Sequence, residues 1–319
     1  MGIIKAFESV LSIVLMVSVG AFLNYRHWFD DDKSNLLVDL VIKVSLPALM
    51  IYNMMSNFTK EELLNSGYGL VVPVISMAIC YLISFAVAYI VGIDPSRRGA
   101  FRSMFFNSNT IFVGLPVNMA LFGEKSLPYV LFYYVANTFF FWTLGVSEIR
   151  KDSTIYNEPD SSKSVFSIET LNKILSPPLI GLLIALFLIL IGVRLPTFLL
   201  DTLKNLGGLT TPLSMIFIGI TISAIKIQNI RFDKEVMALL IGRFIVGPAT
   251  IILLSQIFYM PKLMRDVFVI QSAMPVMTNA AIISKAYGSD SEYVAIMIAM
   301  TTVLIMIVIP IYIYILSYI

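Results

Sequence analysis

Apolar residues run through the chain in stretches about as long as a membrane-spanning helix, separated by short charged or turn-rich links. A helix needs about 20 residues to cross the hydrocarbon core of a bilayer. Ten stretches meet this requirement: residues 6–23, 36–55, 67–91, 98–122, 127–147, 171–192, 203–224, 235–258, 263–286 and 292–317. The pattern predicts an all-α polytopic membrane protein with ten transmembrane helices.

One link is longer than the others and divides the predicted helices evenly. Residues 148–170 carry a run of charged side chains between Glu148 and Lys163. We therefore expect a first five-helix repeat at residues 1–147, a linker at 148–170 and a second five-helix repeat at 171–319. Because five is an odd number, the second repeat would be inverted in the membrane relative to the first, an arrangement typical of alternating-access transporters.

Lysine and arginine residues gather on the side of this linker. Thirteen lie on that side and seven on the other when Lys43 and Arg243, which fall inside apolar stretches, are set aside. Cytoplasmic loops carry an excess of these residues. We therefore expect a multi-pass protein of the cell membrane with a cytoplasmic linker and both termini outside.

Composition and charge exclude several classes of function. The hydrophobic fraction is 58%, charged residues make up 13%, and the net charge is +2, so lipid rather than nucleic acid is the expected surroundings. The single cysteine, Cys80, and the single histidine, His27, leave no cysteine cluster or two-histidine metal site. No nucleophile–histidine–acid set or phosphate-binding loop is present, so we expect no enzyme and no cofactor.

The fourth and ninth predicted helices are the least lipid-like. Each combines a proline with several amides and hydroxyls, and a broken helix must lie inside protein or line a wet cavity. Two breaks at equivalent positions of two repeats indicate a binding site at the middle of the membrane. Hydrogen bonding to neighbouring helices is the structural alternative. The candidate residues are Asn107, Asn109, Gly114, Pro116, Asn118, Pro275, Thr278 and Asn279, with Asn137 of the fifth helix as an additional candidate.

Two cations fall inside apolar stretches. Intramembrane charge is usually paired or functional, so Lys43 and Arg243 could draw an anionic substrate toward the site. Since both lie near the expected cytoplasmic end, extension of the side chains to the membrane surface is an alternative. Acidic residues are confined to links and helix ends, which leaves no obvious carboxylates for a proton relay or a sodium site.

The segment from Asn107 to Gly123, NSNTIFVGLPVNMALFG, resembles the fourth-helix signature of the auxin efflux carrier family, which includes bacterial malate permeases. Weaker matches are Ser45 to Leu49, Arg243 with Pro248, and Met274 to Gly288. The resemblance covers nearly the whole chain. The linker is short, as in the bacterial members of the family and unlike the plant hormone carriers.

The resemblance implies two inverted five-helix repeats whose fourth and ninth helices are broken and cross at Pro116 and Pro275. It implies a scaffold of helices 1, 2, 6 and 7, often used for dimerisation, and a mobile transport region of helices 3–5 and 8–10. By matching position, the substrate-contacting amides would be Asn109, Asn118 and Asn279.

Together these features predict a secondary transporter of small organic anions, such as the dicarboxylate malate, working by alternating access. A homodimer through helices 1, 2, 6 and 7 is the expected assembly. A sodium-coupled organic anion symporter and a non-transport membrane sensor or scaffold are the alternatives.

Overall fold

A computed structural model describes residues 3–57, 67–153, 177–223 and 233–319. These residues are helical throughout, apart from links and one isolated antiparallel bridge between Ser108 and Val276. The chain forms two compact units. Unit 1 comprises Met1–Gly69, Leu115–Pro128 and Leu175–Ala224, and unit 2 comprises Leu70–Gly114, Tyr129–Ile174 and Ile225–Ile319.

The units draw on both halves of the sequence. Apart from Leu115–Pro128, unit 1 corresponds to predicted helices 1, 2, 6 and 7, and unit 2 to predicted helices 3–5 and 8–10. This grouping agrees with the division into two regions that the family resemblance implies. The two sequence repeats, with their linker at 148–170, stay a prediction.

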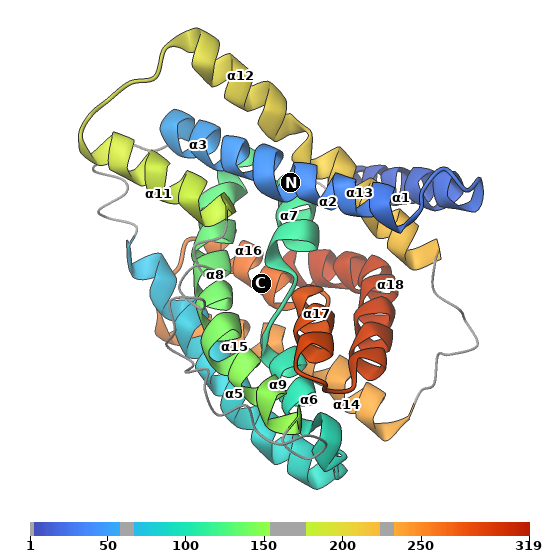
Figure 1. Ribbon diagram of the computed structural model, residues 1–319. Coiled ribbons are helices and arrows are strands. Elements are labelled where there is room, and N and C mark those ends of the chain that lie inside the picture. Colours follow the sequence, from blue (N-terminus) through green and yellow to red (C-terminus); the bar gives the residue numbers. More distant parts are fainter. Residues whose placement is uncertain (1–2, 58–66, 154–176, 224–232) are drawn as a thin grey trace. The chain divides into compact units, whose positions relative to one another are not determined.

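Unit 1 contains long helices that approach one another closely. Its helices are α1 (Ile3–Tyr25), α2 (Asp31–Leu40), the π-helix η1 (Val41–Ser45), α3 (Leu46–Asn57), α7 (Leu115–Phe122), η5 (Glu124–Ser126), α11 (Pro177–Leu190), α12 (Thr197–Gly208) and α13 (Thr210–Ser223). Helix α1 packs against α13, and a Cβ at Gly219 would lie 2.0 Å from the carbonyl oxygen of Val17. Helix α3 lies beside α11 and α12 (Figure 1). Small residues at such contacts let helix backbones meet, as in membrane proteins generally.

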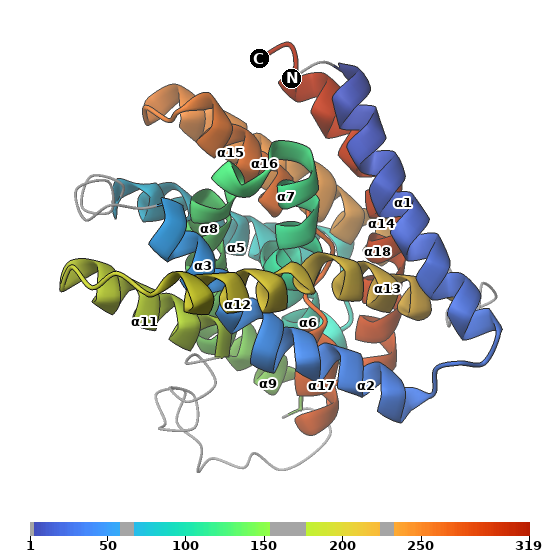
Figure 2. The same cartoon turned by 90° about the horizontal axis from the view of Figure 1, so that it is seen from above.

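Unit 2 consists of shorter helical pieces interrupted by π-helices. They are α5 (Val71–Val91), η3 (Pro95–Arg97), α6 (Arg98–Phe106), η4 (Thr110–Gly114), α8 (Leu127–Phe140, which begins in unit 1), η6 (Phe141–Gly145), α9 (Val146–Ser153), α14 (Lys234–Ile241), η8 (Gly242–Val246), α15 (Gly247–Ile257), α16 (Lys262–Ser272), α17 (Asn279–Ala286) and α18 (Ser291–Leu316). The short 3₁₀-helix η2 (Gly67–Leu70) precedes α5. Helix α6 packs on α5 and α9, and α15 packs on α16 (Figure 2).

Three of the π-helices directly precede a proline. Pro47, Pro116 and Pro248 are each the second residue after a π-helix. A proline has no N–H and its ring clashes with the carbonyl four residues earlier, and widening of the preceding turn relieves both effects. At Pro248 the carbonyl left without its helical donor belongs to Phe244, and the hydroxyl of Tyr312 donates to it. The fourth π-helix, η6, has no such proline, and we have no physical account of it.

Five helices among the described residues are long and apolar enough to cross a membrane: Leu36–Ser56, Val71–Val91, Glu124–Asp152, Lys234–Ile257 and Ser291–Leu316. Shorter apolar helices cover Val14–Tyr25, Thr110–Phe122 and Pro177–Leu190. Large aliphatic side chains such as Leu82, Ile90 and Leu253 are exposed on these helices. Such a surface is stable where lipid is the solvent, so the fold is that of a polytopic membrane protein. The count of ten helices and their inverted repeat stay predictions.

Two predicted boundaries were wrong. The linker was expected to begin at Glu148, but α9 continues to Ser153 because Glu148 and Asp152 are buried and bonded within unit 2. The seventh predicted helix, 203–224, consists of two helices, α12 and α13, separated at Leu209 after the pair Gly207-Gly208. The rest of the linker lies outside the described residues.

Candidate functional site

The fourth and ninth predicted helices are both interrupted. In the first, α6 ends at Phe106, residues 107–109 leave the helix, and the chain resumes as η4 and then α7. In the second, α16 ends at Ser272, residues 273–278 are non-helical, and α17 begins at Asn279. Since unsatisfied backbone is costly in a membrane, the groups released at each break need partners.

The two breaks pair with each other inside unit 2. Ser108 and Val276 form the antiparallel bridge, and the N–H of Asn109 donates to the carbonyl oxygen of Pro275 at 2.8 Å. Two segments from opposite halves of the sequence therefore meet through their backbones. Pro275 takes part in this pairing through its carbonyl oxygen, whereas Pro116 lies in α7, which belongs to unit 1, after the first break at residues 107–109. The crossover at Pro116 and Pro275 stays a prediction.

Side chains satisfy the remaining backbone groups of the bridge. Asn137 is fully buried; its Oδ1 accepts from the N–H of Ser108 and its Nδ2 donates to the carbonyl oxygen of Ser108, both at 2.9 Å. The Oγ1 of Thr301 accepts from the N–H of Val276 at 3.1 Å. Asn137 therefore holds the first break in place, and Thr301, which the sequence did not single out, does the same for the second.

Three further amides line the breaks. Oδ1 of Asn109 accepts from the N–H of Phe112 at 3.2 Å and so caps the helix that follows. Nδ2 of Asn107 donates to the carbonyl oxygen of Ser103 at 3.2 Å, while its Oδ1 has no hydrogen-bond partner in the described part of the chain. Nε2 of Gln271 donates to the carbonyl oxygen of Thr110 at 3.3 Å, and its Oε1 is likewise without a partner there.

Gly114 is required by one of these contacts. A Cβ at Gly114 would lie 2.1 Å from Oε1 of Gln271. Only glycine lets the Gln271 amide rest against this turn of η4. The sequence indicated Gly114 by its spacing from Asn107, but its partner, Gln271, was not among the candidate residues.

Arg243 lies inside unit 2, and its side chain does not extend toward the surface. The residue is 2% exposed. Its guanidinium donates to three backbone carbonyl oxygens, those of Phe105 at 3.3 Å, Ser272 at 2.9 Å and Met274 at 2.7 Å. The carbonyls of Phe105 and Ser272 lie at the C-terminal ends of α6 and α16, and that of Met274 lies in the second break. The alternative in which the Arg243 charge reaches water is therefore wrong.

The other candidates make none of the hydrogen bonds described above. Asn118 is buried in α7, within unit 1. Thr278 and Asn279 are half-buried at the start of α17 in unit 2. Lys43 is exposed on η1 of unit 1, where its Nζ forms an ion pair with Asp39 at 2.7 Å.

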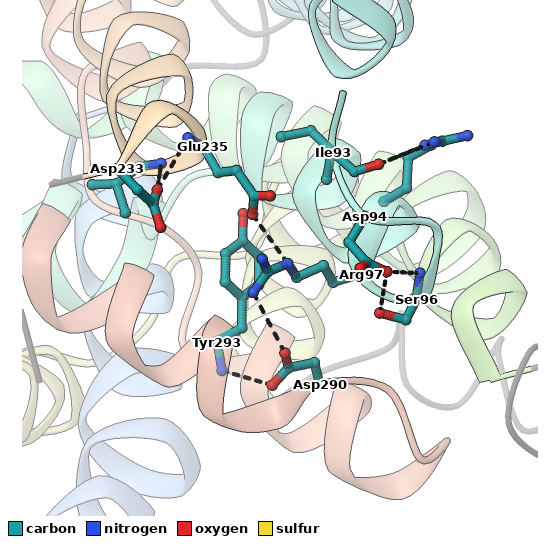
Figure 3. Close-up of polar contacts among 10 residues, drawn as sticks. Ile93, Asp94, Ser96, Arg97, Asp233, Glu235, Asp290 and Tyr293 are labelled. Atoms are coloured by element: carbon teal, nitrogen blue, oxygen red, sulfur yellow. Dashed lines mark hydrogen bonds and ion pairs between the residues drawn. The ribbon is translucent and has the colours of Figure 1, made fainter. Parts of the chain in front are cut away.

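A second polar cluster lies where α6, α14 and α18 begin. Figure 3 shows Arg97 between two carboxylates: its Nε lies 3.0 Å from Glu235 and its Nη1 lies 3.9 Å from Asp290. The guanidinium also covers the ring of Tyr293 at 4.7 Å. Arg97 therefore joins the start of the first broken helix to helices from the second half of the chain. Nearby, outside the spanning helices, Ser96 donates to Asp94 from its N–H and its hydroxyl, which holds the pKa of Asp94 below its usual value.

Acidic residues at the ends of helices are more buried than the sequence indicated. Oδ1 and Oδ2 of Asp152 accept from the N–H groups of Gly99 and Ala100, at 2.6 and 2.7 Å, at the N-terminus of α6. Glu148 accepts from Arg102 at 3.0 Å and from the hydroxyl of Tyr81 at 2.9 Å. A helix N-terminus stabilises a carboxylate, so Asp152 anchors the first broken helix at its start.

Comparison with known proteins identifies the family. A family model described as "Membrane transport protein" matches residues 5–313. The chain is 26% identical over 313 residues to an uncharacterized transporter of Methanocaldococcus jannaschii, covering 96% of this chain and 97% of the relative. It is 25% identical over 310 residues to an uncharacterized transporter of Methanothermobacter thermautotrophicus, covering 96% of each. These findings confirm the resemblance to the auxin efflux carriers: the chain belongs to the membrane transport protein family, whose members include those carriers, and its role is transport across a membrane.

Proposed function

We propose that the protein is a secondary transporter of small organic anions, with dicarboxylates such as malate as the first class to test, and that it works by alternating access. The paired breaks of the two helices in unit 2 carry this proposal. Transporters built from repeats bind their substrates where discontinuous helices meet. The breaks here are lined by buried amides, and the described residues contain no group of three or more His, Cys, Asp or Glu side chains that could hold a metal ion.

The chemistry of the breaks favours an anion. The helices that resume after the breaks present their N-terminal ends there, and such ends attract negative charge. Asn107 supplies an amide in the first break, and Thr278 and Asn279 supply half-exposed polar groups where the second break ends and α17 begins. Neutral donors bind a carboxylate without holding it as tightly as a free arginine, and moderate binding allows release. Family resemblance adds the expectation that the substrates are organic anions.

The two compact units suggest how alternating access is achieved. Unit 2 contains both breaks, so it would act as the transport region, and unit 1 would act as the scaffold. Helices α1, α3, α11 and α13, which belong to unit 1, would then provide the surface for a homodimer. The roles expected for Asn118 and Lys43, which belong to unit 1, stay predictions.

Flux measurements in proteoliposomes test the proposal. Malate, malonate, citrate and indole-acetate should be offered at two pH values, and saturable uptake of at least one is the expected result. N109A and N279A should lower this uptake by about tenfold or more, the factor expected when one hydrogen bond to a charged group is lost. N205A, which removes an exposed amide on α12, is the matched control and should leave uptake unchanged. Wild-type flux in both N109A and N279A would exclude the breaks as the binding site.

A further inference from the structure

The guanidinium of Arg243 occupies the place of a backbone donor that α6 lacks. In a continuous α-helix the carbonyl of Phe105 would accept from the N–H of Asn109. At the break this N–H donates instead to the carbonyl of Pro275. Nη1 of Arg243 donates to Phe105 in its stead, at 3.3 Å.

The same guanidinium also replaces a missing backbone donor in the second broken helix. The carbonyl of Ser272 would accept from the N–H of Val276 in a continuous helix, but that N–H donates to Thr301. Nη2 of Arg243 donates to Ser272 at 2.9 Å and to Met274 at 2.7 Å. One side chain therefore completes the C-terminal ends of both half-helices.

The charges at this point balance without an acidic residue. The C-terminal end of a helix carries roughly −0.5 elementary charge, so two such ends present about −1 to Arg243. Among the described residues, Arg243 forms no ion pair with a carboxylate. The positive charge is thus compensated by the two helix ends and is not left over to attract a substrate.

In other transporters with discontinuous helices, unwound carbonyls and half-helix C-terminal ends bind the coupling sodium ion. We infer that Arg243 is the resident cation of this position, so that the protein transports its substrate with no sodium ion bound between α6 and α16. The inference rests on the proposed transport function and names its coupling. Arg243 is a positioning residue here, because it acts through the two broken helices.

Two substitutions separate charge from hydrogen bonding. R243K keeps the positive charge, whereas R243Q keeps an amide donor and loses the charge. R243Q should lower uptake about tenfold or more, as expected for the loss of a charge-assisted hydrogen bond in a buried site. R243K should retain more uptake and a higher Tm than R243Q. Equal Tm and uptake for the two variants would overturn the inference.

Chemical rescue tests the site directly. R243A removes the side chain and leaves the carbonyls of Phe105, Ser272 and Met274 facing the space that it filled. Millimolar methylguanidinium should raise the Tm and the uptake of R243A, while choline at equal ionic strength should not. A rise with sodium would equally identify a monovalent cation site. An R243A protein that responds to neither methylguanidinium nor sodium, or that transports like the wild type, would contradict the inference.

The wild-type protein provides a test that needs no variant. Its Tm and its uptake should be the same in sodium chloride and in choline chloride. A wild-type flux that requires sodium would overturn the inference even if every variant failed to fold. Absence of flux for the whole anion panel would instead refute the proposed function, and the Tm responses of R243K, R243Q and R243A would still decide the role of Arg243.

Discussion

The two helix breaks in unit 2 differ in length and in how their backbone groups are bonded. The first break, residues 107–109, is short, and the amide of Asn137 bonds both backbone groups of Ser108. The second break, residues 273–278, is longer and contains Pro275, and a single hydroxyl, that of Thr301, accepts from its backbone. The first break is thus held by the Asn137 side-chain amide, here called the amide clamp. The second break depends more on the Arg243 guanidinium.

The difference suggests a division of roles. A buried amide with both of its groups bonded fixes a backbone more firmly than one hydroxyl. We therefore expect the first break to determine stability and the second to adapt during transport. The half-exposed residues Thr278 and Asn279 lie where the second break ends, and a substrate would need some freedom to enter and leave there.

The largest effect is expected from the amide clamp. N137L leaves the N–H of Ser108 without a partner in a buried position, while the C=O of Ser108 loses one donor and keeps the N–H of Thr110. An unsatisfied buried group costs about 1–3 kcal/mol and a lost hydrogen bond about 1 kcal/mol, so the free energy of unfolding should fall by about 3 kcal/mol. Thermal unfolding in detergent measures the change. N137D retains an acceptor for the N–H and should lie between N137L and the wild type. A Tm for N137L equal to the wild type would show that the clamp is dispensable.

A smaller loss is expected at the second break. T301V removes the acceptor of the Val276 N–H and keeps the shape of the side chain, so the cost should be about 1–2 kcal/mol. T301S keeps the hydroxyl and serves as the control. If T301V destabilised the protein more than N137L, the assignment of the firmer break to the first helix would be reversed.

Substitution of Pro275 and of Pro116 compares the two broken helices by their effect on transport. P275A restores a backbone N–H inside the second break, whereas P116A changes a residue of α7 that is not part of either paired segment. P275A should therefore lower uptake more than P116A, while its free energy of unfolding changes by less than about 1 kcal/mol. Uptake and Tm measured on the same preparations check this. Equal uptake in the two variants would indicate that Pro116 matters as much for transport as Pro275 does.

The smallest effect concerns the start of the first broken helix. Asp94 caps η3 before α6, while Pro261, at the corresponding position before α16, makes no side-chain cap. Because the pKa of Asp94 is lowered in the folded protein, its contribution to stability is present above its ordinary value of 3.8 and is lost as the pH falls through the lower folded value. The difference in Tm between wild type and D94N should be small at pH 7 and vanish at the acid end. A difference that grows below pH 3.8 would contradict this reading.

Much of the fold could be predicted from the sequence because lipid imposes a simple pattern on helices. Apart from the stretch at 203–224, the apolar stretches were placed within a few residues of the described helices, and prolines with clustered amides marked the two interrupted segments. The end of α9 was missed, since charged residues such as Glu148 and Asp152 indicate a loop unless their buried partners are known. The division into two units was available only through family resemblance, because contacts between distant segments have no local signal.

Less of the candidate site could be predicted. Proline was taken as the point of interruption, yet the first break is made at Ser108, where the amide of Asn137 replaces helical hydrogen bonds. The spacing of residues identified Arg243 as unusual but not its three carbonyl partners, which come from two other helices. Thr301 and Gln271 gave no distinct signal, since a hydroxyl or an amide in an apolar helix most often bonds its own helix.

The widened turns before Pro47, Pro116 and Pro248 also set the register of the helices that follow them. Each π-turn accommodates an extra residue, and one residue rotates an α-helix by about 100°. The helices before and after such a turn therefore present different faces from those that a continuous helix would present. Deleting one residue from η8 would turn α15 relative to α14 and separate Thr250 on α15 from Cys80 on α5. Length in these segments is thus as strictly constrained as composition, and a single-residue deletion there should be more harmful than most substitutions.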